Sequence, residues 1–162
     1  MSIKIEQSQR RRKAVTAGDQ SKKNVAGNAF EGLVQGLAGD RPRAIEAIRA
    51  GFSANVLKDA GIYFDVPANR IRAIVRLPET TAHALVRRGA TMDVATSERI
   101  WRLADVMFLA KDVFEDAEAA KAWLRTRNRA FDDAAPMDFL DTEPGAMAVR
   151  QVLNAIATGG AA

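Results

Sequence analysis

A long amphipathic helix constrains the fold of this chain more than any other feature of its sequence. Behind Asp93, a candidate N-cap, apolar residues recur at spacings of three and four positions: Ile100, Leu103, Met107, Ala110 and Phe114. This spacing puts the five side chains on one face of an α-helix. Because such a face is stable only when other elements cover it, the pattern predicts a helical core around this helix.

Shorter helices are predicted on both sides of the long one. Those before it cover residues 30–37, 43–50, 54–64, 67–75 and 78–88, with Ser53 as the N-cap of the third. Those after it cover 116–124, 136–140 and 143–156, with a loop at 126–134 and Thr142 as the last N-cap. No segment of useful length alternates apolar and polar residues as a β-strand does. We therefore predict an all-α fold, with a helix-turn-helix-like N-terminal part followed by a small helical C-terminal domain.

The net charge of +4 is unevenly distributed along the chain. Residues 1–30 carry seven Lys and Arg against two Asp and Glu, residues 31–111 carry twelve against nine, and residues 112–162 carry five against nine. A basic segment favours polyanions and an acidic one disfavours them. We divide the chain into a basic, disordered arm (1–28), a helix-turn-helix region (30–111) and a C-terminal domain (112–162). The arm either adds phosphate contacts or is only a solvated tail.

Composition and motifs limit the classes of function. The chain has no cysteine and a single histidine, His83, so we expect no disulfide and no zinc site. It has no Walker-type phosphate loop, no Gly-x-Ser-x-Gly motif, no signal peptide and no apolar run that could span a bilayer. We expect a cytoplasmic protein without a metal, a cofactor, a membrane partner or catalytic residues.

The segment from Ala68 to Arg88 is the best candidate for a nucleic-acid site. It contains two short helices joined by a tight corner, the layout of a helix-turn-helix. In the second helix, Ala82, Leu85 and Val86 share the inward face. The opposite face carries the candidate DNA-binding residues Thr80, Thr81, His83, Arg87 and Arg88. An ordinary amphipathic helix with a solvated polar face has the same pattern, and this alternative stays open.

The stretch AWLRTRNRAF (122–131) also has the basic and aromatic composition of a single-strand nucleic-acid groove. It lies, however, in the acidic C-terminal region, which argues against a nucleic-acid ligand. We interpret Trp123 and Leu124 as core residues and expect the three arginines to pair with Asp132, Asp133 or a neighbouring helix.

Residues from about 51 to 159 resemble the Xre-type antitoxins that carry the MbcA/ParS/Xre C-terminal domain. The specific part comprises VFEDAEAAKAWLRTRNRAF and APMDFLDTEPGAMAVRQVLNAIATG. Residues that fit the family pattern in order include Val113, Phe114, Trp123, Leu124, Thr126, Asn128, Ala130, Pro136, Leu140, Thr142, Gly145, Val149, Leu153 and Gly159. Arg76, Glu115 and Asp132 stand where the family usually has glycine, and Arg127 stands where it usually has proline.

The resemblance implies an antitoxin that binds and occludes a RES-type, NAD-consuming toxin. It also implies that the protein represses its own operon by binding operator DNA, and that a homodimer forms a hetero-oligomer with the toxin. The candidate toxin-binding residues are Trp123, Arg127, Asn128, Gly145, Arg150, Asn154 and Gly159. Two alternatives remain: a stand-alone helix-turn-helix transcriptional regulator without a toxin partner, and an adaptor that touches no DNA.

Overall fold

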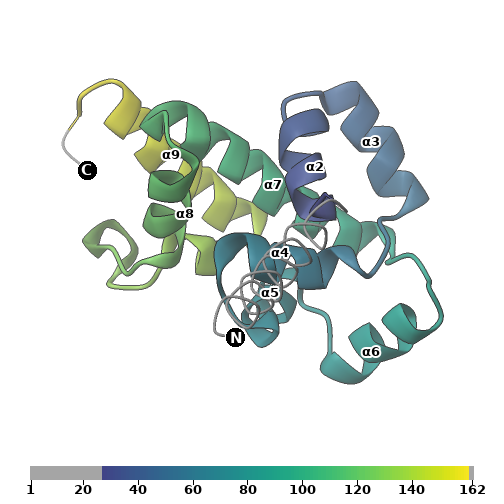
Figure 1. The fold of residues 1–162 in the computed structure, drawn as a ribbon. Coiled ribbons are helices and arrows are strands. Elements are labelled where there is room, and N and C mark those ends of the chain that lie inside the picture. Colours follow the sequence, from purple (N-terminus) through teal and green to yellow (C-terminus); the bar gives the residue numbers. More distant parts are fainter. Residues whose placement is uncertain (1–26, 161–162) are drawn as a thin grey trace, which may run out of the picture.

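The computed structural model describes residues 27–160, and its secondary structure in that range is entirely helical. Figure 1 shows the arrangement of the α-helices. They are α2 (Ala29–Gly36), α3 (Arg41–Ala50), α4 (Val56–Phe64), α5 (Ala68–Val75), α6 (Glu79–Arg87), α7 (Val94–Phe114), α8 (Ala117–Arg125) and α9 (Glu143–Ala157). Two 3-10 helices, η1 (Arg129–Phe131) and η2 (Pro136–Phe139), lie between α8 and α9. The predicted all-α class is confirmed.

Helix α7 is the centre of the fold. It has 21 residues, and the carboxylate of Asp93 accepts a hydrogen bond from the Thr96 amide at 2.7 Å, as expected for an N-cap. The predicted core residues Ile100, Leu103, Met107 and Ala110 are fully buried. Figure 1 shows α7 running between α2 and α3 on one side and α8 and α9 on the other, and α7 contacts all four helices.

One apolar core extends across the predicted boundary between the two regions. Buried side chains from Phe30 in α2 to Leu153 in α9 belong to a single cluster. Residue 112, where we divided the chain by charge, lies inside α7. The helix-turn-helix region and the C-terminal region are therefore packed on the same central helix.

Two arginines, one half-buried and one buried, reinforce this union. The guanidinium of Arg70 in α5 donates to both carboxylate oxygens of Asp138 in η2, at 2.8 and 2.9 Å. Arg102 in α7 is 6% exposed, donates to the Leu140 carbonyl at 3.2 Å, and forms ion pairs with Glu98 and Glu143. Because a bidentate arginine fixes geometry as well as charge, these contacts hold the C-terminal region against α5 and α7.

An aromatic cluster joins α2, α4 and α8 at the surface of the core. The ring of Tyr63 packs against Phe30 and Phe64, and the Lys121 ammonium lies 4.2 Å from the centre of the tyrosine ring. Burial, together with the charges of Glu31 and Glu118, raises the pKa of Tyr63 to about 12. Tyr63 therefore stays neutral over the physiological range.

Several local expectations are corrected. Ser53 does not cap α4: its hydroxyl accepts from the Asn55 amide at 3.4 Å, its backbone forms an isolated bridge with Thr91, and α4 begins after Asn55 without a side-chain cap. The predicted loop 126–134 contains η1, and the helix at Pro136 is a 3-10 helix. For Arg125, by contrast, the expected pairing with a neighbouring helix is found, because it pairs with Asp65 at the end of α4. The predicted arm 1–28 lies outside the described residues except for residues 27 and 28, where Asn28 caps α2.

In the range 27–160, no helix combines the length and the apolar composition that crossing a membrane requires.

The structure also shows why the family pattern has glycine at three positions where this chain has other residues. Arg76, Glu115 and Asp132 have φ values of 56°, 53° and 51°. This left-handed conformation is easy for glycine and tolerable for aspartate, but unfavourable for other residues.

The left-handed backbone predicts the stability of two glycine variants. Glu115→Gly removes about 1–2 kcal/mol of backbone strain from the folded state. It also gives the unfolded chain more conformational entropy, which lowers the stability by about 0.4–1 kcal/mol. We therefore expect a net gain of about 0.5–1 kcal/mol, or about 1–4 °C in the thermal midpoint. Asp132→Gly is the matched control and should change the midpoint little. An unchanged or lower midpoint for Glu115→Gly would contradict this account.

The N-cap of α7 predicts a pH-dependent loss of stability. Hydrogen bonds from Thr96 lower the pKa of Asp93 in the folded state. The contribution of this carboxylate is therefore present above the ordinary aspartate range and is lost as the pH falls through the lowered pKa. Asp93→Ala should cost about 1 kcal/mol at pH 7. In thermal melts, the difference in midpoint between the wild type and the variant should become smaller in acid. A difference that does not change with pH would contradict a contribution from the ionised carboxylate.

Candidate functional site

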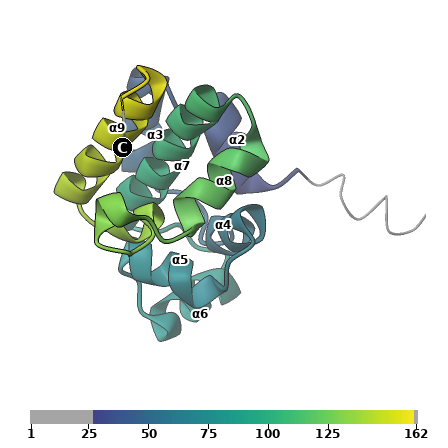
Figure 2. The ribbon, with the colours of Figure 1, turned by 90° about the vertical axis from the view of Figure 1, so that its left-hand side faces the viewer.

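Helices α5 and α6 form the two-helix unit that the sequence predicts. Ile71, Ile74 and Val75 bury the inward face of α5, whereas Ala82 is the buried residue of α6. Between them, Arg76 ends α5 in a left-handed conformation and Pro78 precedes α6. Figure 1 shows α6 at the edge of the molecule, away from α8 and α9, and Figure 2 shows it below α5. Most of the surface of α6 is therefore free to contact a partner.

The five candidate DNA-binding residues are exposed side chains of α6 and its C-cap: Thr80, Thr81, His83, Arg87 and Arg88. Two features of this surface were not predicted. Glu79 adds a carboxylate that lies 3.5 Å from the Arg72 guanidinium and 3.8 Å from the His83 ring. Val86, expected on the inward face, is 43% exposed.

A hollow of about 360 Å³ accounts for the exposure of Val86. It lies between α4, α5 and α6, and its apolar walls include Leu57 and Val86. Lys58, Arg72, His83 and Arg87 surround these walls with basic groups. His83 and Arg87 thus border the hollow as well as the exposed face of α6.

Four of the seven candidate toxin-binding residues have structural contacts within the chain. Trp123 packs between Phe114 and Phe131, and the Asn128 side chain accepts from the Ala130 amide at 2.9 Å. Gly145 is buried, and a Cβ there would collide with the Phe139 carbonyl. These three residues shape the C-terminal region whether or not they also contact a partner.

Arg150 is the fourth of these residues. Its guanidinium donates to Asp105 in α7 at 3.1 Å and to Glu143 at 3.0 Å, which fixes α9 on α7. The separation of 45 residues between Arg150 and Asp105 hides this pair from sequence reasoning.

The remaining candidates, Arg127, Asn154 and Gly159, are exposed. Arg127 borders a polar hollow of about 540 Å³ that Arg70, Arg125, Asp132, Asp133 and Asp138 also line. Asn154 lies on the solvent face of α9, and Gly159 follows that helix with a φ of 74°. The exposed part of the predicted set is therefore split between the segment after α8 and the end of α9.

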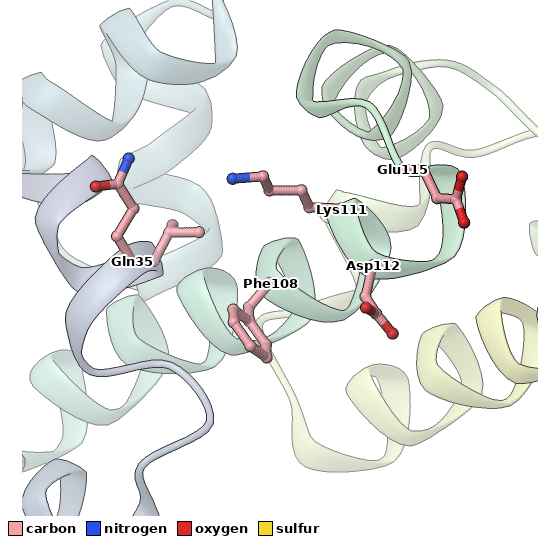
Figure 3. Close-up of a pocket in the computed structure, with 6 residues that line it drawn as sticks. Gln35, Phe108, Lys111, Asp112 and Glu115 are labelled. Carbon is pink, nitrogen blue, oxygen red and sulfur yellow. The ribbon is translucent and has the colours of Figure 1, made fainter.

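Figure 3 shows another surface hollow, of about 380 Å³, between α2 and α7. Gln35 projects from α2, and Phe108, Lys111 and Asp112 project from α7, with Glu115 at its end. Phe108 is 43% exposed, which makes it one of the large apolar side chains on this surface. Mixed apolar and charged groups of this kind suit contact with a macromolecule more than chemistry on a small substrate.

Comparison with known proteins agrees with this arrangement. Residues 109–159 match the family described as the antitoxin Xre/MbcA/ParS C-terminal toxin-binding domain. This range begins near the end of α7 and covers α8, η1, η2 and α9.

Two curated relatives extend the similarity beyond that domain. An Antitoxin Xre of Pseudomonas putida is 30% identical over 115 residues, which cover 69% of this chain and 69% of the relative. An Antitoxin Xre of Yersinia enterocolitica is 26% identical over 116 residues, which cover 71% of this chain and 78% of the relative. With its helical core and its match to the toxin-binding domain, this chain belongs to the Xre antitoxin family.

Proposed function

We propose that this protein is the antitoxin of a toxin–antitoxin pair, that it binds and occludes a RES-domain toxin that consumes NAD, and that it represses its own operon by binding operator DNA. The observation that carries the proposal is the match of residues 109–159 to a toxin-binding domain. In this proposal the chain performs no chemistry itself. It acts as a homodimer that assembles with the toxin into a hetero-oligomer in the cytoplasm.

The charge of the C-terminal region supports an occluding role. Residues 112–162 carry nine acidic and five basic residues. A toxin site that holds a negatively charged dinucleotide needs basic groups, and an acidic surface complements those groups. The antitoxin then competes with the dinucleotide by covering the entrance to its site.

The exposed face of α6 supports the DNA-binding role. Arg87 and Arg88 are exposed at its end, and Thr80 and Thr81 are exposed near its beginning. A helix that presents small polar residues and arginines away from the core can enter a major groove. In this proposal the toxin-binding and DNA-binding surfaces belong to different parts of one packed core.

The toxin-binding surface is best tested at exposed residues. Deletion of residues 145–162 would remove Val149 and Leu153, both fully buried, and would damage the core. We instead expect Asn154→Arg, which adds a cation that opposes the toxin's basic groups, and Arg127→Ala, which removes an exposed side chain, each to weaken binding to the co-expressed product of the adjacent gene by about tenfold or more, or about 1.4 kcal/mol. Affinity is measured by titration of the purified proteins.

Ala50→Arg, an exposed substitution at the end of α3, is the matched control and should bind as wild type does. Circular dichroism should show the same helical content and thermal midpoint for all three variants. Wild-type affinity in both test variants would exclude these positions from the interface. If the adjacent product does not bind the wild-type chain at all, the stand-alone regulator becomes the better account.

The DNA-binding surface is tested by a double substitution. Arg87→Ala with Arg88→Ala removes two exposed cations from α6. We expect weaker binding to the DNA upstream of the gene, with a slope of log affinity against log salt that is smaller by about one to two. Fluorescence anisotropy at several salt concentrations measures both quantities. An unchanged slope would show that α6 does not contact the DNA.

A further inference from the structure

Arg76 occupies a backbone conformation that its side chain does not favour. Five residues other than glycine have a positive φ in the described part of the chain: Asp65, Arg76, Glu115, Asp132 and Asp133. Aspartate tolerates this conformation because its short side chain forms local hydrogen bonds, whereas arginine has no such compensation. Residues held in unfavourable conformations concentrate at functional sites, which makes Arg76 a candidate for a functional role.

The local structure requires the backbone of Arg76 but not its side chain. The Arg76 amide donates to the Ala73 carbonyl at 3.2 Å, and the Leu77 amide donates to the Arg72 carbonyl at 3.0 Å. These two bonds close the end of α5, and glycine is the residue that most often occupies this position. A glycine would therefore form the same corner with less strain.

The side chain of Arg76 adds an exposed positive charge to the corner. Arg72 is 17% exposed and pairs with Glu79 at 3.5 Å, so these two charges largely cancel. Arg76 is exposed, and among residues 27–160 no carboxylate lies within ion-pairing distance of it. Arg99 also brings a guanidinium to the corner, where it donates to the Val75 carbonyl at 3.5 Å, but its side chain is part-buried, so Arg76 is the more exposed cation there.

The position of Arg76 along the chain brings this charge near α6. Glu79, where α6 begins, is three positions after Arg76, so the two Cα atoms lie within about 11 Å of each other. A cation beside the beginning of a helix that enters a groove of DNA is suitably placed for the phosphates that border that groove.

We propose that Arg76 contacts a backbone phosphate of the DNA beside the groove that α6 enters. The proposal rests on the DNA-binding role proposed above and adds a residue to it. In this account the chain keeps a strained arginine at the corner because the phosphate contact positions α6 on the duplex. The contact adds affinity for any sequence and carries no base specificity.

The test combines stability with DNA binding in one variant. We expect Arg76→Gly to have a raised thermal midpoint and to bind about five- to tenfold more weakly at about 0.1 M salt, with a salt slope smaller by about one. The loss should be the same on a duplex of the DNA upstream of the gene and on a random duplex of equal length. Arg76→Lys should keep the salt slope of the wild-type protein.

Arg129→Ala is the charge-matched control, because Arg129 is exposed in η1 and the substitution removes one cation outside the α5–α6 corner. It should retain the wild-type salt slope. Wild-type affinity and slope in Arg76→Gly would overturn this inference while the role of α6 in DNA binding stands. A loss confined to the upstream duplex would also overturn it, in favour of a base contact. If the wild-type protein binds neither duplex, the DNA-binding proposal itself fails.

Discussion

The burial of α7 between two groups of helices is the interaction on which the rest of the structure depends. Its residues Ile100, Leu103 and Met107 are fully buried, and each contributes about 1.5–3 kcal/mol by leaving water. Because α2 and α3 pack on one side and α8 and α9 on the other, neither group has a complete core without α7. A substitution in the buried face of α7 therefore weakens the packing of both regions of the chain.

Where a local rule decided the outcome, the sequence was sufficient to predict the structure. Asp93 and Thr142 accept hydrogen bonds from amides three residues on, as capping residues do, and the apolar spacing of α7 identified its buried face. Ser53 has the same chemistry, but its hydroxyl accepts from the Asn55 amide, two residues on, and α4 begins only at Val56. Its backbone also forms a bridge with Thr91, a contact between distant residues that no local rule predicts.

The candidate sites show the same limit. The exposed positions of Arg87 and Arg88 follow from helical periodicity, so they could be predicted. The pairing of Arg150 with Asp105 joins residues far apart in the sequence, and no local pattern encodes it. The family pattern marked Gly145, but only the structure shows that the Phe139 carbonyl leaves no room for a side chain there. A family motif thus identifies important positions without separating packing from binding.

The arginines of AWLRTRNRAF illustrate how one motif divides between these roles. Arg125 donates to the Phe64 carbonyl at 2.9 Å and pairs with Asp65, so it holds α8 to α4. Arg127 stays exposed beside a polar hollow, where a partner can reach it. In the proposed antitoxin, the core holds an exposed surface in place against the toxin. Inhibition then requires only that this surface be complementary to the entrance of the toxin's site.

The most direct test of the antitoxin role is bacterial growth during expression of the product of the adjacent gene, with and without this chain. The account predicts that the product alone arrests growth and depletes cellular NAD, and that co-expression of this chain restores both growth and NAD. Continued arrest, while both proteins accumulate in soluble form, would contradict it.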